Sequence, residues 1–232
     1  MSKYRRSIKK SSKKTTPTKY LRPIKKSNKK TTTIPIKDKK EIELIMRCLR
    51  RRIEQANTET KKGQARRNWM LVLLGFNTAF RVEDLVQLKV SDVIKGYFSI
   101  IENKTGKCQN YRINKYLFED IKNYILENNL TNSDYLFYTQ KKAHLMPMTR
   151  QHVDRILKSA ADEIKLRQKF SAHSLRKTWA YQKYKDGTPL ITISKMLNHH
   201  DVEETLLYIC WGEEDIDRER EATYYGGVHR KN

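Results

Sequence analysis

A histidine and an arginine lie three residues apart in the stretch SAHSLRKTW, at His173 and Arg176. Residues three apart on a helix share a face, so both side chains would point the same way. A guanidinium matches two oxygens of a phosphate, and an imidazole can move a proton near neutral pH. The pair therefore suits a phosphate group, although a core or capping histidine beside a surface arginine is the commoner arrangement for such a pair taken alone.

Two further positions carry positive charge upstream of this pair. Arg81 follows the most apolar stretch of the chain, where its charge needs an ion-pair partner, such as Glu83 or Asp84, or a phosphate. Lys104 lies in the turn NKTGK, with Lys107 as its rival. A lysine in a hairpin turn is usually only solvated, but such a turn can also reach into DNA.

The stretch MLNHHDVEETLLYI supplies the last candidates. His199 and His200 are adjacent and cannot share one helix face, so at most one of them enters a given site. Tyr208 is one of 13 tyrosines, and most tyrosines are core or surface residues. None of these signals is specific when taken singly.

The composition favours a polyanionic partner. The chain has 232 residues and a net charge of +23, which indicates nucleic acid or an acidic membrane face, or else a solubilising surface. Cys48, Cys108 and Cys210 are far apart and predict reduced thiols rather than a zinc site or a disulfide framework. We expect no signal peptide, because the N-terminus is charged, and no membrane span, because the apolar run at 69–76 is too short.

Residues 1–36 are predicted to form a disordered basic arm. The stretch YRRSIKKSSKKTT, from Tyr4, recurs as YLRPIKKSNKKTT, from Tyr20, and has too little apolar content to fold. We expect the arm to bind DNA phosphates, with a solubilising tail, a nuclear-import signal or a membrane-surface contact as the alternatives. The lysines assigned to DNA binding are Lys9, Lys10, Lys13, Lys14, Lys25, Lys26, Lys29, Lys30 and Lys107.

The remaining sequence predicts a mainly α protein with a small antiparallel β-sheet, an α+β fold. Residues 37–210 would form the catalytic domain, and residues 211–232 a C-terminal segment. Strand-like residues 95–102 and 108–113 flank the NKTGK turn and predict a hairpin, while 135–138 would be a short strand or an extended link. Apolar spacing predicts helices at 37–57, 62–79, 82–88, 115–128, 149–164, 173–186, 189–197, 202–210 and 213–222.

Taken in order, an arginine, a hairpin lysine, His-x-x-Arg, and a histidine followed nine residues later by tyrosine resemble the tyrosine recombinase, or phage integrase, family. The matching stretches are TAFRVEDLVQLKVSDV (78–93), ENKTGK (102–107), HSLRKTWAYQ (173–182) and LNHHDVEETLLY (197–208). The resemblance implies the fold of that family's catalytic domain.

The resemblance also implies roles for the charged side chains. Arg81 and Arg176 would clamp the scissile phosphate, and Lys104 would protonate the leaving 5′ oxygen. His173 and His199 would hydrogen-bond the phosphate and assist proton transfer. Fixed cations of this kind offset the negative charge that gathers on the phosphate oxygens in the transition state.

Tyr208 would be the nucleophile that forms a 3′-phosphotyrosyl intermediate, and Asp84 falls where the family has a supporting acid. A covalent intermediate conserves bond energy for rejoining the strand. We therefore expect neither a metal nor a cofactor.

Some positions depart from the family pattern. Asn198 stands where a glycine usually precedes the histidine, Lys177 where a second histidine often follows the arginine, and Trp179 where phenylalanine is common. Counting back nine residues from the tyrosine selects His199 rather than His200. The chain resembles a short form of the family without a folded core-binding domain, and residues 213–222 would dock on a neighbouring protomer.

These observations predict a site-specific DNA recombinase or integrase of a phage or other mobile element, in the cytoplasm of a bacterial host or another compartment that contains DNA. Its expected partners are double-stranded DNA and further copies of the chain in a tetramer, with an accessory DNA-bending protein as a further candidate and no membrane. The alternative from another class is a DNA-binding regulator that keeps the recombinase fold but exchanges no strands. A type IB topoisomerase or a hairpin telomere resolvase would share the chemistry.

Overall fold

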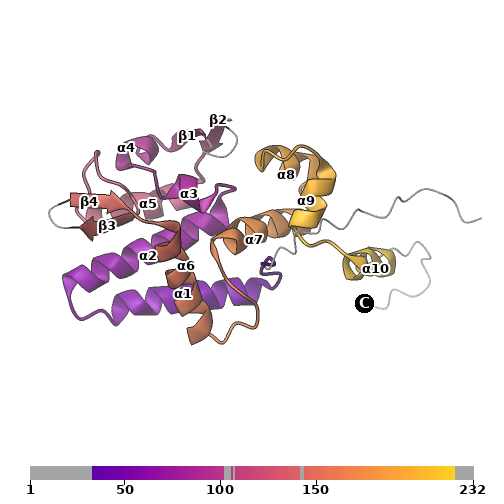
Figure 1. The fold of residues 1–232 in the computed structure, drawn as a ribbon, viewed down its shortest axis with the longest axis horizontal. Coiled ribbons are helices and arrows are strands. Elements are labelled where there is room, and N and C mark those ends of the chain that lie inside the picture. The colour runs from indigo at the N-terminus through magenta and orange to yellow at the C-terminus, as the bar shows by residue number, and fades with distance from the viewer. Residues whose placement is uncertain (1–32, 102–105, 107, 142–143, 223–232) are drawn as a thin grey trace, which may run out of the picture. The chain divides into compact units, whose positions relative to one another are not determined.

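The computed structural model describes residues 33–101, 106, 108–141 and 144–222 (Figure 1). Helices dominate this part of the chain, and four short strands form two separate antiparallel pairs. The elements are α1 (Lys39–Glu54), α2 (Glu59–Asn77), α3 (Val82–Leu85), α4 (Val90–Val93), β1 (Tyr97–Ile101), β2 (Cys108–Arg112), α5 (Lys115–Glu127), β3 (Tyr138–Lys141), β4 (His144–Pro147), α6 (Arg150–Glu163), α7 (Ala172–Lys185), α8 (Leu190–Met196), α9 (Val202–Tyr208) and α10 (Glu213–Ala222). The predicted fold class, mainly α with a small antiparallel sheet, is confirmed.

Side-chain caps fix where the first two helices begin. The Asp38 carboxylate accepts a hydrogen bond from the backbone N–H of Lys40 at 2.8 Å, and α1 starts at the next residue after this cap. The Thr58 hydroxyl caps α2 in the same way, so this helix begins at Glu59, three residues before the predicted start. Such caps satisfy N–H groups that have no partner within the helix.

The predicted hairpin is present as β1 and β2, paired from Tyr97 opposite Arg112 to Ile101 opposite Cys108. A second hairpin, β3–β4, was not predicted beyond a short strand or link at 135–138. Its sequence, YTQKKAHLMP, lacks the Asn-Gly or Asp-Gly pair that usually signals a two-residue turn, and its apolar residues do not alternate.

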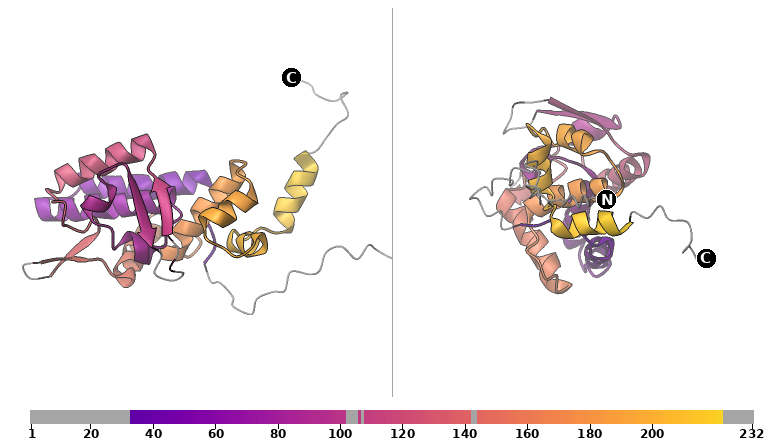
Figure 2. Two further views of the ribbon diagram at one scale, coloured as in Figure 1. Left: turned by 90° about the horizontal axis from the view of Figure 1, so that it is seen from above. Right: turned by 90° about the vertical axis from the view of Figure 1, so that its right-hand side faces the viewer.

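The described helices bury two apolar cores that meet along α7. The larger core lies among α1, α2, α5, α6 and the first half of α7. The smaller core joins the second half of α7 to α8 and α9, which lie together beside it in Figure 1 and in the left view of Figure 2. Residues 174–181 of α7 are all buried, so this helix receives side chains on every face.

Residues Thr33–Lys37, here called the strap, run against α7 before α1 begins. Thr33 and Ile36 are buried, and the backbone N–H of Ile36 donates to the Thr178 hydroxyl at 2.8 Å. The side chain of Gln182 donates to the carbonyl oxygen of Ile36 at 3.1 Å. Residues 33–36, which the sequence placed at the end of the basic arm, thus pack against α7, because Ile36 supplies apolar surface that the core takes up.

The arm residues singled out for DNA binding, Lys9 to Lys30, lie outside the described residues. None of the described helices has the length and apolar character that crossing a membrane requires.

Candidate active site

Arg176 projects from α7 into the interior and is 2% exposed. Its guanidinium donates to the backbone carbonyl oxygens of Ala79 and, at 2.5 Å, Leu197. Ala79 comes two residues before Arg81, and Leu197 comes two residues before His199. A guanidinium has five N–H donors, so it can hold both carbonyls and still offer donors to a phosphate. Arg176 thus joins two of the predicted catalytic segments to α7.

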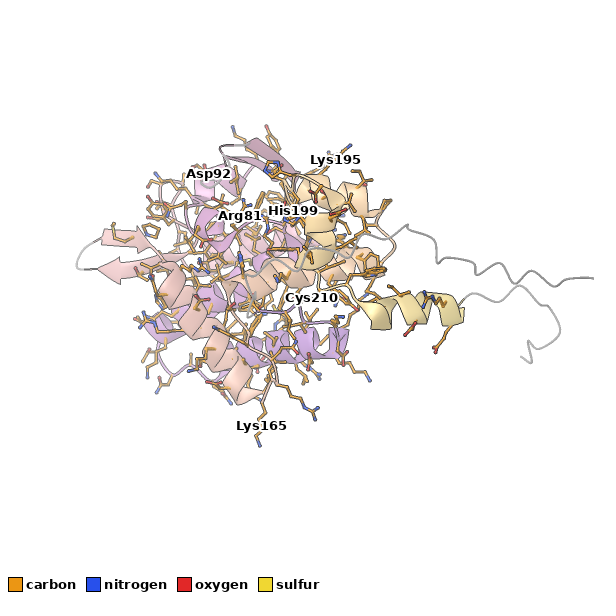
Figure 3. All side chains as sticks on the ribbon, turned by 45° about the vertical axis from the view of Figure 1, so that its right-hand side comes forward. Arg81, Asp92, Lys165, Lys195, His199 and Cys210 are labelled. Carbon is orange, nitrogen blue, oxygen red and sulfur yellow. The ribbon has the colours of Figure 1, made fainter. Side chains whose placement is uncertain are left out.

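Arg81 directly precedes the short helix α3, without a capping hydrogen bond from its side chain, and it is partly exposed. Figure 3 shows Arg81 and His199 in the same region of the molecule, and the two are close enough for their charges to interact. The Glu83 carboxylate, one expected partner of Arg81, accepts a hydrogen bond from Arg150 at 2.9 Å. Asp84, the predicted supporting acid, is buried within α3 and 3% exposed.

The β1–β2 hairpin is attached directly beside this segment. The Tyr111 hydroxyl donates to the carbonyl oxygen of Asn77 at 2.6 Å, and its ring meets Phe80 edge-on with centroids 5.3 Å apart. Lys104 and Lys107, which belong to the turn of this hairpin, lie outside the described residues. Their assignments as leaving-group acid and DNA contact stay predictions.

His173 lies in the first turn of α7 and is exposed. The hydroxyl groups of Ser171 and Ser174 form a capping box that fixes the start of this helix. Although part of its side chain reaches the surface, His173 loses hydration on its inner side, and this loss, followed by the positive charges of Arg150, Lys177 and Arg176, lowers its pKa below the usual value. The imidazole is therefore mainly neutral at pH 7, and its ring lies edge-on to that of Tyr208 with centroids 6.2 Å apart.

His199 follows α8, and its side chain is 5% exposed. Its Nδ1 lies 3.0 Å from the Thr205 hydroxyl oxygen, and that hydroxyl also donates to the carbonyl oxygen of Asp201 at 3.5 Å. The tautomer that satisfies both contacts carries its proton on Nδ1 and a lone pair on Nε2. Burial lowers the pKa of His199 to about 4, against the opposing effect of the Glu204 carboxylate, whose Oε1 lies 4.0 Å from Nε2, so the imidazole is neutral at pH 7.

The neighbouring residue, His200, is exposed, and its backbone N–H bonds the Glu204 carboxylate at 3.2 Å. The structure therefore brings His199, and not His200, to the predicted nucleophile.

Tyr208 ends α9 and packs against the smaller core. Its ring meets that of His199 edge-on, with centroids 5.0 Å apart, and its hydroxyl oxygen is buried. Burial raises the pKa of the Tyr208 hydroxyl, while the positive charges of Arg176 and Arg81 oppose this rise. The phenol is therefore protonated at neutral pH, and a neutral imidazole stands beside it.

Sequence reasoning did not assign a role to two residues that the structure brings to this site. Thr205 fixes the ring of His199, and its place three residues before Tyr208, on the same face of α9, could have identified it. Lys177 was regarded as a peripheral departure. Its ammonium lies 5.2 Å from the centroid of the Tyr208 ring.

The arrangement thus brings together two arginines, two neutral imidazoles and a tyrosine hydroxyl from four chain segments. Such a set can bind a phosphate diester and deliver an oxygen nucleophile to its phosphorus. Within the described ranges, no three His, Cys, Asp or Glu side chains cluster in a way that could hold a metal ion.

This mainly helical fold and its site define the class of tyrosine recombinase catalytic domains. The sequence matches the phage integrase family over residues 38–211, more than half of its 232 residues, and the chain belongs to that family.

Two relatives illustrate the match in sequence. The chain is 30% identical to the probable integrase/recombinase YoeC of Bacillus subtilis over 145 residues, 62% of this chain and 77% of YoeC. It is also 30% identical to the tyrosine recombinase XerA of Pyrococcus furiosus over 144 residues, 61% of this chain and 49% of XerA. The match thus spans only about half the length of XerA.

Solved structures show the same fold. The crystal structure of XerA recombinase aligns with a TM-score of 0.64 and 16% identity. The alignment covers 86% of this chain and 68% of the chain in that crystal structure. A post-cleavage complex of the XerH site-specific recombinase with its difH substrate also gives 0.64, with 18% identity, covering 82% of this chain and 52% of XerH.

Proposed function

We propose that this protein is a site-specific DNA recombinase whose nucleophile is Tyr208. The observation that carries the proposal is the place of Tyr208, whose ring lies against the neutral imidazole of His199 and whose buried hydroxyl lies within the field of two arginines. Binding alone needs no buried tyrosine hydroxyl in the field of two guanidinium groups. The names of the relatives support the proposal, since XerA and XerH are called recombinases.

In the proposed reaction the Tyr208 oxygen attacks the phosphorus of a DNA phosphodiester while Nε2 of His199 accepts the phenolic proton. A bond forms between tyrosine and the 3′ phosphate, and the bond to the 5′ oxygen breaks. Arg81, Arg176 and His173 hold the phosphate oxygens, where negative charge accumulates. Lys104 is the predicted donor of the proton that the leaving 5′ oxygen takes up. Attack by a 5′ hydroxyl of another strand reverses the step and completes the exchange.

The proposed reaction needs several protomers on DNA and a genetic element that carries the protein. We infer that four protomers act on two double-stranded DNA sites, with an accessory DNA-bending protein as a further partner. The chain would belong to a phage or other mobile element and act in the cytoplasm of its host. Helix α10 is a candidate for docking on a neighbouring protomer, and it is anchored at its start by the buried Asp215, which pairs with Lys37 at 3.4 Å.

The test uses a nicked suicide duplex made from repeats in the DNA that flanks the gene. The proposal expects a covalent protein–DNA band on a denaturing gel, and the Tyr208→Phe variant should bind the same duplex without forming this band. Tyr184→Phe is the matched control, because Tyr184 lies in the smaller core and accepts a hydrogen bond from Trp211 at 2.8 Å, away from the proposed phosphate site.

Specific binding without an adduct would contradict the proposal and favour a regulator that keeps the recombinase fold. An adduct that persists in Tyr208→Phe would show that another residue is the nucleophile.

A further inference from the structure

Lys177 is a lysine with no exposed surface, in the turn of α7 that faces Tyr208. Its ammonium donates to the backbone carbonyl oxygen of Thr33 at 2.9 Å. On its other side the same ammonium lies over the Tyr208 ring, 5.2 Å from the centroid. An ammonium buried in this way loses its hydration, so the carbonyl dipole and the electron-rich ring face must hold its charge.

Burial lowers the pKa of the Lys177 ammonium from its usual value. A methionine or leucine would fill the same apolar space without that cost. Keeping a cation at this depth therefore calls for an explanation other than packing, and the ammonium lies directly over the ring of the proposed nucleophile.

We propose that Lys177 is a positioning residue for Tyr208, fixed in place by the strap and holding the face of the phenol ring so that the ring keeps its orientation toward His173 and His199. The proposal rests on the proposed function, in which Tyr208 is the nucleophile. Lys177 itself touches neither the phosphate nor the reacting oxygen in this scheme.

The Tyr208 ring has three defined neighbours. The planes of the His199 and His173 rings stand at 75° and 76° to it, while the Lys177 ammonium lies over its face. A cation is attracted to the face of an aromatic ring, where the π electrons concentrate negative charge, so this contact favours one tilt of the ring. Reacting atoms must be aligned closely, and a small misplacement slows a reaction strongly.

The strap is what keeps the ammonium at that face. Ile36 and Gln182 bind the strap to α7 through the contacts described above, so the Thr33 carbonyl stands at a fixed place above Lys177. Lys177 thereby links the strap, which follows directly on the basic arm in the sequence, to the tyrosine that would carry out cleavage.

The experiment compares Lys177→Met with Lys122→Met in the full-length protein. Lys122 lies over the ring of Phe118, 5.2 Å from its centroid, on a helix away from the site, so its substitution removes a cation–ring pair of the same type and length. At saturating suicide duplex, Lys177→Met should slow adduct formation by about 10- to 100-fold while its Kd for DNA stays within about twofold. Lys122→Met should leave both unchanged, and Lys177→Arg, which keeps the cation, should recover part of the rate.

A second readout does not depend on cleavage. The rings of the tyrosines are labelled with ¹³C, and the NMR signal of Tyr208 is identified by its disappearance in Tyr208→Phe. Lys177→Met should shift or broaden this signal, and Lys122→Met should not. If Lys177→Met does not fold, as judged by thermal melting, Lys177→Gln replaces it, since the amide can still donate to Thr33 without carrying charge.

An unchanged cleavage rate together with an unchanged Tyr208 signal overturns the proposal. So does a slower rate that is matched by an equal loss of DNA affinity, because that would place Lys177 in binding. If the wild type forms no adduct, the proposed function fails by itself, and the ring signal then decides alone whether Lys177 orients Tyr208.

Discussion

At the scale of single residues, the sequence pattern identified side chains by type and order, but not by environment. Counting back from Tyr208 selected His199, and this is the histidine of the pair whose ring lies beside that of Tyr208 in the structure. The sequence carries no sign of the role proposed for Lys177, because that role rests on its burial beneath the strap, which no local pattern reveals.

Asn198 shows how a departure from the family pattern can keep the backbone geometry. Its φ is +52°, in the left-handed region that glycine enters freely and asparagine tolerates better than most residues. Asn198 thus adopts, ahead of His199, a backbone conformation that glycine would also enter without strain. We expect Asn198→Ala to lower the free energy of unfolding by about 1 kcal/mol and Asn198→Gly to leave it nearly unchanged.

Urea denaturation of the two variants measures this difference. Equal destabilisation of both would mean that the side chain of Asn198, rather than its backbone conformation, matters for stability.

Arg176 holds two buried carbonyl oxygens and is also proposed to clamp the phosphate, so its substitutions should separate the structural role from the proposed chemical one. Arg176→Ala removes both hydrogen bonds to buried carbonyls and should cost about 2–3 kcal/mol of stability. Arg176→Lys keeps the charge but cannot hold both carbonyls and a phosphate together, so we expect a smaller stability loss with cleavage still reduced at least about 100-fold.

Adduct formation and denaturant unfolding, measured on both variants, test this expectation. DNA binding should be largely retained in each folded variant, since surface lysines supply most of the affinity. Full cleavage by Arg176→Lys would contradict a phosphate-clamping role.

At the scale of elements, apolar spacing predicted most helices within a few residues, because amphipathic stripes and caps are local signals. The β3–β4 hairpin was missed because its strands lack alternation. The placement of α7 between two cores was not predictable either, since it depends on a close approach of helices far apart in the sequence.

That approach occurs at Gly75 of α2. A Cβ at this position would lie 2.8 Å from the Leu175 Cδ1 atom on α7, with the rest of that side chain also close. Leu175 is buried in the larger core, so it has little room to move. We expect Gly75→Val to destabilise the protein by about 1–3 kcal/mol through overpacking and to slow cleavage by displacing the α7 residues of the site.

Gly63, on the same helix, is the matched control for Gly75. A Cβ there would meet Asn128 at an ordinary distance of 3.8 Å, so Gly63→Ala should raise the free energy of unfolding by about 0.5–1 kcal/mol. Thermal melting and the adduct assay on both variants check the pair. A neutral Gly75→Val would show that α2 and α7 can separate without cost.

At the scale of the whole molecule, three histidines predict how stability responds to acid. Loss of hydration lowers the pKa of His152, His173 and His199, so each resists protonation when folded. The unfolded chain then binds more protons than the native one below about pH 6.5, and stability must fall as the pH is lowered from there toward about 4. We expect Tm to drop between pH 7 and pH 5, and to drop less in His199→Gln than in the wild type.

Calorimetric melting across this pH range checks the expectation, with His200→Gln as a control because His200 is exposed. A wild-type Tm that rises toward pH 5 would contradict the sign.

The positive charge of the basic arm predicts how the DNA affinity of the whole chain depends on salt. Each phosphate that a lysine neutralises releases a counterion, so DNA affinity should fall steeply with salt. Deleting residues 1–32 should weaken binding at low salt and flatten the dependence of log K on log salt by about 0.9 for each phosphate that the arm neutralises, while leaving Tm nearly unchanged.

Deleting residues 1–36 should flatten the salt dependence equally but also lower Tm, because this deletion removes the buried Thr33 and Ile36 and leaves Lys177 without its carbonyl. Fluorescence anisotropy over a salt series, with melting of both variants, separates the two effects. The same salt slope with and without the arm would mean that the arm does not contact DNA.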